Sequence, residues 1–461
     1  MSRRRPPARR HRVPGLTGIV APLLLELVLG IAVGVAGTAL AASIGDEAGA
    51  SFSLANLVVA MLFVLFRVIG AGVGVVVTQA LGSERRDTAD AVSLATLGAS
   101  TWLGGGTALL AVLFAEPLLR LLDAPPSVLP LATTLLVAMA PAMLLDAFNA
   151  SMSSVMRAHL RGREALMVIV VMQVVLLALA WPAMQGVGSW GGLGLAGFAL
   201  ALAVSRLVGL GLHLHLWKRQ LGLVPRAPDW WRLPRATLAP VLHIGLPGAA
   251  ENIAWRVAFT FSVAVASGLG AQALATHAYV QQANHLVMMF GVATGLGMEI
   301  VVGHCIGAGR LREAHAVVRR GLLRGLVVST LLATAAAFAG PWFLGQFTRD
   351  PAILAAGQVL LWWSIGLESG RTYNLVLVNA LRAAGDARFP VLAGAASMAL
   401  VLAGGSWLLG KHFGLGLTGL WIAYVADEWL RGMINWWRWT RLGWVPHARA
   451  AHRRMRQSLP A

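Results

Sequence analysis

Acidic side chains interrupt several long apolar stretches of this sequence. Glu26 and Glu251 each follow a proline by four residues, and Asp146 lies eleven residues before Arg157. Glu26 lies ten residues from Leu16 and Glu251 eleven from Pro240, about 15 Å along a helix, and the distance of Asp146 from Arg157 predicts a similar depth. A carboxyl group with little access to water is easier to protonate, so it can exchange a proton near neutral pH. We therefore predict Glu251, Glu26 and Asp146 as ion-coupling groups. Their alternative role is an interhelical hydrogen bond or a contact with an arginine.

The spacing of charges along a helix separates predicted pairs from unpaired groups. Residues three or four apart share one face of a helix, which predicts ion pairs. The pairs predicted in this way are Glu368 with Arg371 and Asp427 with Arg431. Glu251 and Arg256 are five residues apart and point about 140° from each other. Glu251 therefore needs a partner on another helix, or a proton.

Arginines within the apolar stretches give information on the charge of a transported solute. A guanidinium group stays charged and binds a carboxylate or phosphate through two parallel hydrogen bonds, so Arg256 and Arg371 in a cleft would favour an anionic or zwitterionic solute. The alternative is that they only neutralise Glu and Asp. Trp255 is a possible stacking partner, and Gln281 shares a helix face with two histidines. The predicted substrate-binding residues are Arg256, Arg371, Glu368, Asn374, Trp255 and Gln281. No histidine pair has the cysteine or acid neighbours of a zinc site, so we predict neither metal nor cofactor.

The elements that must position these residues are membrane-spanning helices. The chain is 57% hydrophobic and 12% charged, with a mean hydropathy of +0.71, which leaves too few polar residues to cover a water-soluble fold. Apolar runs recur at the length of about 20 residues that a helix needs to cross a bilayer. The twelve runs are 16–41, 52–78, 90–114, 128–150, 163–185, 193–217, 240–266, 273–303, 317–340, 352–376, 388–409 and 416–437.

The positive residues predict the orientation in the membrane. The net charge is +18, and most of the 37 lysines and arginines lie in the N-terminal tail, in alternate loops and in the C-terminal stretch that begins at Arg438. That asymmetry is typical of loops that stay in the cytosol, so we expect both termini to be cytosolic. The basic residues are spread over many loops and form no single stripe, which argues against nucleic-acid binding. No small-residue cleavage site follows the first apolar run, so the basic start is predicted to be a retained tail.

The two halves of the sequence are repeats with an offset of 225 residues. Pro22 and Glu26 match Pro247 and Glu251 at this offset, and the match continues to Asn149 with Asn374 and Arg157 with Arg382. Beyond residue 192 the offset is 222, where GLGLAG matches GLGLTG. Each half has six spans, an even number, so the halves are parallel repeats. The expected organisation is a cytosolic basic tail (1–15), an N-lobe (16–217), a cytosolic linker (218–239), a C-lobe (240–440) and a cytosolic tail (441–461).

Several segments resemble the multidrug and toxic compound extrusion (MATE) transporters. They are the proline, glutamate and glycine of GLPGAAENIAWRVAFTFSVAVASGLG, the loop starts VVTQALGSERRDTA and VVGHCIGAGRLREA, and NALRAAGDARFP. The resemblance implies two six-helix bundles in a V that export organic solutes in exchange for Na⁺ or H⁺. Many members have an acid in the first helix, where this chain has Gly37, and some Na⁺-coupled members have acids where it has Trp255 and Arg371. That Na⁺ site cannot be transferred to this chain.

Together these patterns predict a secondary antiporter in the cell inner membrane, with no enzymatic activity. We expect it to be a monomer that exports small organic solutes or drugs, with H⁺ favoured over Na⁺ as the coupling ion. One alternative is a flippase for lipid-linked precursors, although such proteins often have fourteen spans. Another is an exporter of anionic metabolites such as flavin nucleotides. A membrane enzyme acting on lipids would need a nucleophile or metal cluster near the cytosolic or outer surface, for example HxxxxD or several His and Asp together, and we find no such grouping.

Overall fold

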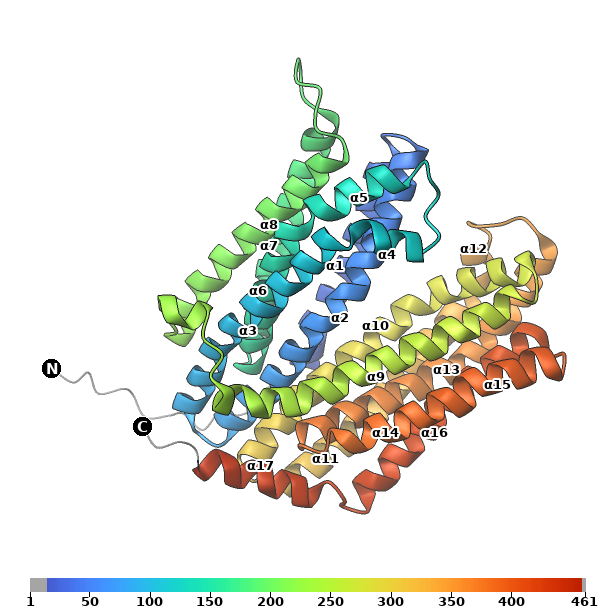
Figure 1. Ribbon diagram of the computed structural model, residues 1–461. Coiled ribbons are helices and arrows are strands. Elements are labelled where there is room, and N and C mark those ends of the chain that lie inside the picture. The colour runs from blue at the N-terminus through green and yellow to red at the C-terminus, as the bar shows by residue number, and fades with distance from the viewer. Residues whose placement is uncertain (1–14, 458–461) are drawn as a thin grey trace.

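The computed structural model describes residues 15–457, and it describes their side chains except at positions 64, 65, 67 and 68. The predicted tail 1–15 therefore lies, apart from Gly15, outside the described residues, as do the last four residues of the predicted tail 441–461. Helices dominate the described part, and they form two bundles that diverge from one end (Figure 1).

The N-lobe contains the first eight α-helices. They are α1 (Leu16–Ala42), α2 (Asp46–Gly82), α3 (Arg86–Leu113), α4 (Ala115–Leu121), α5 (Leu129–Ala138), α6 (Ala140–Ala158), α7 (Gly162–Gln185) and α8 (Leu195–Leu216). The predicted span 128–150 is bent by 46° between α5 and α6. Pro141 lies in the first turn of α6 and has no backbone N–H to continue the hydrogen bonds of α5, which explains the break.

The C-lobe repeats this order. Its helices are α9 (Arg235–Ser267), α10 (Ala271–Gly307), α11 (Leu311–Phe338), α12 (Gly340–Leu344), α13 (Pro351–Ala383), α14 (Arg388–Ser397), α15 (Gly404–Trp407) and α16 (Gly416–Thr440), followed by α17 (Val445–Gln457). One π-helical segment, Met398–Ala403, joins α14 to α15, and a second, Leu408–His412, extends α15 to His412. The helix α9 starts five residues before the predicted span at 240, because an apolar run marks only the part of a helix that lies in hydrocarbon.

The described helices account for twelve spans. Nine are long and apolar enough to cross a membrane, and the bent pair α5 and α6 makes a tenth. The remaining two are α9 and α16, with 33 and 25 residues. Charged side chains such as Glu251, Asp427 and Glu428 lower their hydropathy, and the ion pairs described below explain how these groups are tolerated. The predicted fold, an all-α membrane protein of twelve helices in two lobes, is confirmed.

Buried apolar side chains show where the lobes are separate and where they meet. One cluster around Phe52 and Phe198 contains only N-lobe residues, and another around Val265 and Trp421 contains only C-lobe residues. Two further clusters combine both lobes. In one of them Val241 packs with α2 and α3, and in the other the first turns of α1 pack with α10. These mixed clusters lie at the end of the molecule where α17 and the start of α1 are found (Figure 1).

We call the contact between the last turns of α2 and α10 the seam. Gln79 Nε2 donates to the carbonyl oxygen of Ala383 at 2.8 Å, and His304 Nε2 lies 2.9 Å from the carbonyl oxygen of Ala158. Both bonds cross from one lobe to the other. A Cβ atom at Gly82 would lie 2.3 Å from the His304 carbonyl oxygen, and one at Gly307 would lie 2.0 Å from that of Gln79. The helices approach this closely only because both positions are glycine.

Candidate functional site

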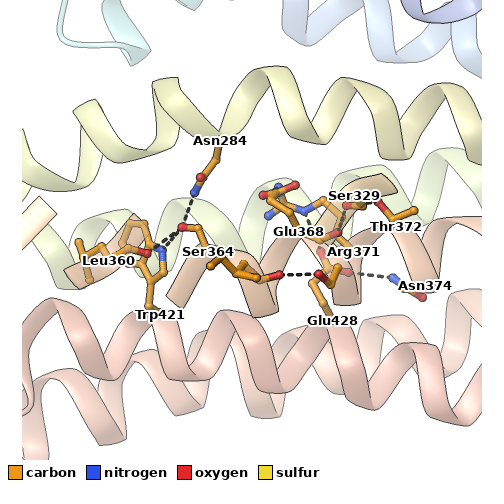
Figure 2. A network of polar contacts seen from close by, with 12 residues as sticks. Asn284, Ser329, Leu360, Ser364, Glu368, Arg371, Thr372, Asn374, Trp421 and Glu428 are labelled. Atoms are coloured by element: carbon orange, nitrogen blue, oxygen red, sulfur yellow. Dashed lines mark hydrogen bonds and ion pairs between the residues drawn. The ribbon is translucent and has the colours of Figure 1, made fainter. Parts of the chain in front are cut away.

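A buried group of charges lies between α13 and α16. We call Glu368, Arg371, Asp427, Glu428 and Arg431 the C-lobe charge cluster. Arg371 Nη1 donates to Glu368 Oε1 at 2.6 Å, one helical turn away, and its Nε donates to Glu428 Oε1 at 3.2 Å on α16. Figure 2 shows Arg371 between these two glutamates. The arginine therefore joins the two helices as well as neutralising charge.

The second arginine of the cluster binds the two acids of its own helix. Arg431 Nη2 lies 2.7 Å from Asp427 Oδ2 and 2.9 Å from Glu428 Oε2. Two neutral side chains add hydrogen bonds, from Ser397 Oγ to Asp427 at 2.7 Å and from Asn374 Nδ2 to Glu428 at 3.0 Å. The ion pairs predicted from helical spacing, Glu368 with Arg371 and Asp427 with Arg431, are confirmed.

The cluster contains one acid more than it has bases. Three carboxylates face two guanidinium groups, so the fully ionised cluster has one excess negative charge. Glu368 is only 1% exposed, and its Oε2 atom has no hydrogen-bond partner among the described residues. An uncompensated charge with so little water is costly, and binding one proton or one monovalent cation removes the excess.

A narrow cavity beside the cluster connects it to aromatic side chains. Its walls include Trp255, Phe259 and Tyr424 together with Arg371, Asp427 and Glu428. Its volume of about 10 Å³ is at the lower limit for one water molecule. The Trp255 and Phe259 rings stack with centroids 5.0 Å apart. The cavity thus places an aromatic wall directly beside the charges.

The N-lobe contains the same site in reduced form, with its charges exchanged. Asp146 is equivalent to Arg371 at the 225-residue offset, and Arg206 is equivalent to Glu428 at the 222-residue offset. Arg206 Nε lies 2.6 Å from Asp146 Oδ1. Asn149, the equivalent of Asn374, donates to the Arg206 carbonyl oxygen at 2.9 Å. The geometry of an interhelical ion pair is thus repeated, and its polarity is reversed.

The positions of the extra C-lobe charges hold uncharged residues in the N-lobe. Met143, Ser205 and Gly209 are the equivalents of Glu368, Asp427 and Arg431. The N-lobe site therefore has one acid and one base, and it is balanced without a bound ion. Of these two equivalent sites, the C-lobe site alone has the excess carboxylate.

The two glutamates that follow prolines make equivalent ion pairs near the seam. Arg157 Nη1 donates to Glu26 at 3.0 Å, and Arg382 Nη2 donates to Glu251 at 3.0 Å. Glu299 is a further acid near Arg382, at 3.7 Å. The sequence reasoning missed both arginines as partners. The signal was present, because acids and arginines match at one offset, so their separations in the two halves are identical.

The structure brings four of the predicted substrate-binding residues together. Glu368, Arg371 and Asn374 belong to or contact the cluster, and Trp255 lines its cavity. Two lie apart. Arg256 is exposed on α9 and Gln281 is half-buried on α10, and neither has a hydrogen bond or ion pair with another described residue. The predicted coupling residues Glu26, Glu251 and Asp146 each have an arginine within 3.0 Å.

The chain has two lobes of six spans that are related by a repeat, and paired charges are buried inside the bundles. This architecture is that of a membrane transporter with a pseudo-twofold axis. The MatE family model matches residues 22–181 and again residues 247–407, once in each lobe. The chain belongs to the multidrug and toxic compound extrusion (MatE) family and is a multi-pass membrane protein. The predicted family is confirmed.

Relatives of known sequence and structure agree with this assignment. The chain is 27% identical to the uncharacterized transporter YisQ of Bacillus subtilis, over 93% of this chain and 94% of that protein. It is 25% identical to a probable multidrug resistance protein NorM of Bradyrhizobium diazoefficiens, over 88% of each. A crystal structure of a MATE protein in the bent conformation superimposes with a TM-score of 0.86 at 16% identity, over 95% of this chain and 96% of that one. The structural match shows the fold.

Proposed function

We propose that this chain is a secondary antiporter that exports small organic solutes in exchange for H⁺. The observation that supports this is the C-lobe charge cluster, in which three buried carboxylates face two guanidinium groups. Uptake of one proton neutralises the excess charge, and its release restores it. A cycle that alternates between these two states couples an ion gradient to a change of conformation.

We place Glu368 first among the coupling carboxyls. Among the described residues it forms an ion pair with Arg371 alone, and one of its oxygens has no partner there. Glu251, Glu26 and Asp146 remain in the proposal as further coupling groups. Each already faces an arginine, so each would have to lose that contact before it gained a proton.

A proton suits the cluster better than Na⁺. A proton binds one carboxylate oxygen and needs no coordination shell. Na⁺ requires several oxygen ligands, and here the N–H groups of Arg371 occupy oxygens of both Glu368 and Glu428. The positive guanidinium would also repel the cation. Na⁺ coupling therefore remains the second choice.

We further propose an orientation in the cell inner membrane with both termini and the linker 218–239 in the cytosol. The positive residues of alternate loops support it. In this orientation the seam closes the cytosolic side, and the lobes diverge outward. We keep the monomer as the working state, with the N-lobe at 16–217 and the C-lobe at 240–440, and we propose no enzymatic step.

Transport by purified protein in liposomes tests the coupling. We expect an imposed pH gradient to drive accumulation of a fluorescent aromatic cation, and an equal Na⁺ gradient to drive little. Glu368→Gln leaves two carboxylates and two arginines, so the cluster is balanced with no proton to exchange. This variant should keep its fold and lose proton-driven transport. Glu116→Gln is the matched control, because Glu116 forms an exposed pair with Arg120 far from the cluster. Equal proton coupling in both variants would contradict the assignment.

One observation favours a second cargo class. Arg256 is exposed on α9 without an ion pair to a described residue, and it directly follows the aromatic Trp255 in the sequence. An anionic aromatic solute such as a flavin nucleotide could stack on one and pair with the other. Competition of the cationic probe with an anionic aromatic phosphate ester separates the two cargoes, and loss of that competition in Arg256→Gln would support the anionic one. The same assay addresses the flippase alternative, since a lipid-linked precursor should then compete in place of either solute.

A further inference from the structure

A cavity lies between the two lobes directly beside the seam. Its walls come from α2 and α3 of the N-lobe, from the first turns of α9, and from α17. Its volume is about 270 Å³, close to the lower end of the range for ligand pockets, about 300–1,000 Å³. Because both lobes line it, the cavity has this shape only while the seam is closed.

The cavity has an apolar wall and a cationic edge. Val92, Ile244 and Met455 are among the buried apolar side chains that line it. Arg454 and His243 provide its ionisable side chains, and no carboxylate is among the described residues that line it. An amphiphile with an apolar chain and an anionic head matches this distribution.

Arg454 is free to bind such a head group. It is exposed, and it makes no hydrogen bond or ion pair with another described residue. Arg388 and His447 lie within electrostatic reach of the neighbouring His243. Asp386, the acid that His447 contacts at 3.8 Å, is already bound by Arg438 at 2.9 Å. The field at this edge of the cavity is therefore positive.

Arg454 lies on α17, a helix with one buried face and one basic face. Ala448, Ala451 and Met455 form its buried face against the rest of the protein, while Arg453 and Arg454 are exposed. Such a helix, with a basic outer face, lies along a membrane interface. In Figure 1 α17 lies beyond the ends of α2 and α10, and the ends of membrane-spanning helices are where lipid head groups are expected.

We propose that the seam cavity binds one anionic phospholipid of the cytosolic leaflet. Its acyl chain packs against Val92, Ile244 and Met455, and its phosphate binds Arg454. The leaflet rests on the orientation proposed above, whereas binding itself does not depend on transport. Because the lipid contacts both lobes, it stabilises the state in which the seam is closed.

Lipid binding to the purified full chain, without solute or ion gradient, tests the proposal. Dioleoyl phosphatidylglycerol should bind as one tightly held copy in native mass spectrometry and raise the unfolding temperature. Dioleoyl phosphatidylcholine, which has the same chains, and inorganic phosphate should do neither. Arg454→Gln should weaken phosphatidylglycerol binding about fivefold. Arg453→Gln, which removes the adjacent charge outside the cavity, should leave it unchanged.

Variants that fill the cavity provide an independent test of lipid binding. Ala91→Phe from the N-lobe and Ala236→Phe from α9 keep every charge and occupy the space of the acyl chain, so each should block binding. If one of them fails to fold, the other serves. Equal stabilisation by both lipids, equal losses in Arg453→Gln and Arg454→Gln, or binding by folded variants with a filled cavity would overturn the proposal. Loss of transport coupling with normal lipid binding would contradict only the proposed function.

Discussion

Gln79 and His304 are related by the 225-residue repeat, and each side chain forms a hydrogen bond to a backbone carbonyl of the opposite lobe. The distances are 2.8 Å from Gln79 to Ala383 and 2.9 Å from His304 to Ala158. The two acceptors are related by the same repeat. The seam therefore has an approximate twofold axis of its own, and opening the molecule on this side must break both bonds.

We expect Gln79→Leu to shift the protein toward the state with an open seam. Loss of one hydrogen bond, about 1 kcal/mol, changes the ratio of the two states about fivefold. Spin labels at cysteines replacing Ser83 and Ala308, in a Cys305→Ser background, report the separation of α2 and α10. Gln358→Leu is the control, because Gln358 donates to the Ala337 carbonyl at 2.9 Å within one lobe. An unchanged distance distribution in Gln79→Leu would contradict the seam contact.

We expect Gly82→Ala to open the seam further than Gln79→Leu does. The added Cβ would lie 2.3 Å from the His304 carbonyl oxygen, and a backbone atom can yield only if its helix moves. Cys305 reports the change, since its side chain is 3% exposed and packs in a cluster that joins both lobes. Its alkylation by a maleimide should become faster. At Gly70, on the same helix, an added Cβ meets no described atom within 4 Å, and Gly70→Ala should alkylate at the native rate.

The acid and the base occupy opposite positions in the two equivalent ion pairs, one in each lobe. We therefore predict that the pair of Asp146 and Arg206 tolerates an exchange of its acid and its base. Asp146→Asn or Arg206→Gln leaves a charge without its partner and should destabilise the fold by about 3 kcal/mol. The double variant Asp146→Arg with Arg206→Glu should recover most of the loss, because Arg371 and Glu428 show this polarity at the equivalent positions. Thermal unfolding in nanodiscs measures the recovery. A double variant as unstable as the single variants would contradict the prediction. It would show that the residues around the two ion pairs differ too much for the pair to be reversed.

The pair Glu251 and Arg382 separates a structural role from a coupling role. A double-mutant cycle with Glu251→Gln and Arg382→Gln should give a coupling energy of about 1–2 kcal/mol. Glu299 lies 3.7 Å from Arg382 and should limit the cost of Glu251→Gln. Proton movement driven by solute is measured in the same variants. If Glu251→Gln kept full stability and lost proton movement, Glu251 would be a coupling group. The excess negative charge of the C-lobe charge cluster would then no longer explain proton-coupled transport by itself.

Much of the architecture was predictable from the sequence because it depends on patterns that lipid enforces. Apolar runs, basic loops and the repeat predicted two lobes of six spans. The bend at Pro141 was not predicted, because a proline within an apolar run marks a possible break but not its angle. The partners of Glu26 and Glu251 were also missed. Helical spacing finds charge pairs on one helix, whereas these arginines reach across the bundle from 131 residues away.

In the C-lobe charge cluster, too, contacts within one helix were predictable and contacts between helices were not. Glu368 with Arg371 followed from a separation of three residues, but the contact from Arg371 to Glu428 joins α13 to α16 and needs the fold. The reversed pair in the N-lobe is hard to recognise because the offset changes from 225 to 222 between its two members. Aligning the two segments separately matches Arg206 with Glu428 on the amino-acid sequence alone.

If the proposed exchange holds, the balance of three carboxylates against two guanidinium groups also sets an energetic limit on the transporter. Under the proposed exchange, a site with one excess charge would bind and release one monovalent ion in each cycle. If the cargo is a singly charged cation exchanged for one proton, no net charge crosses the membrane, and the membrane voltage contributes nothing to the work. The steepest cargo gradient that the protein could maintain would then equal the proton gradient, about tenfold for each pH unit. A neutral cargo would draw on the voltage as well, so the dependence of accumulation on membrane potential would report the charge of the natural solute.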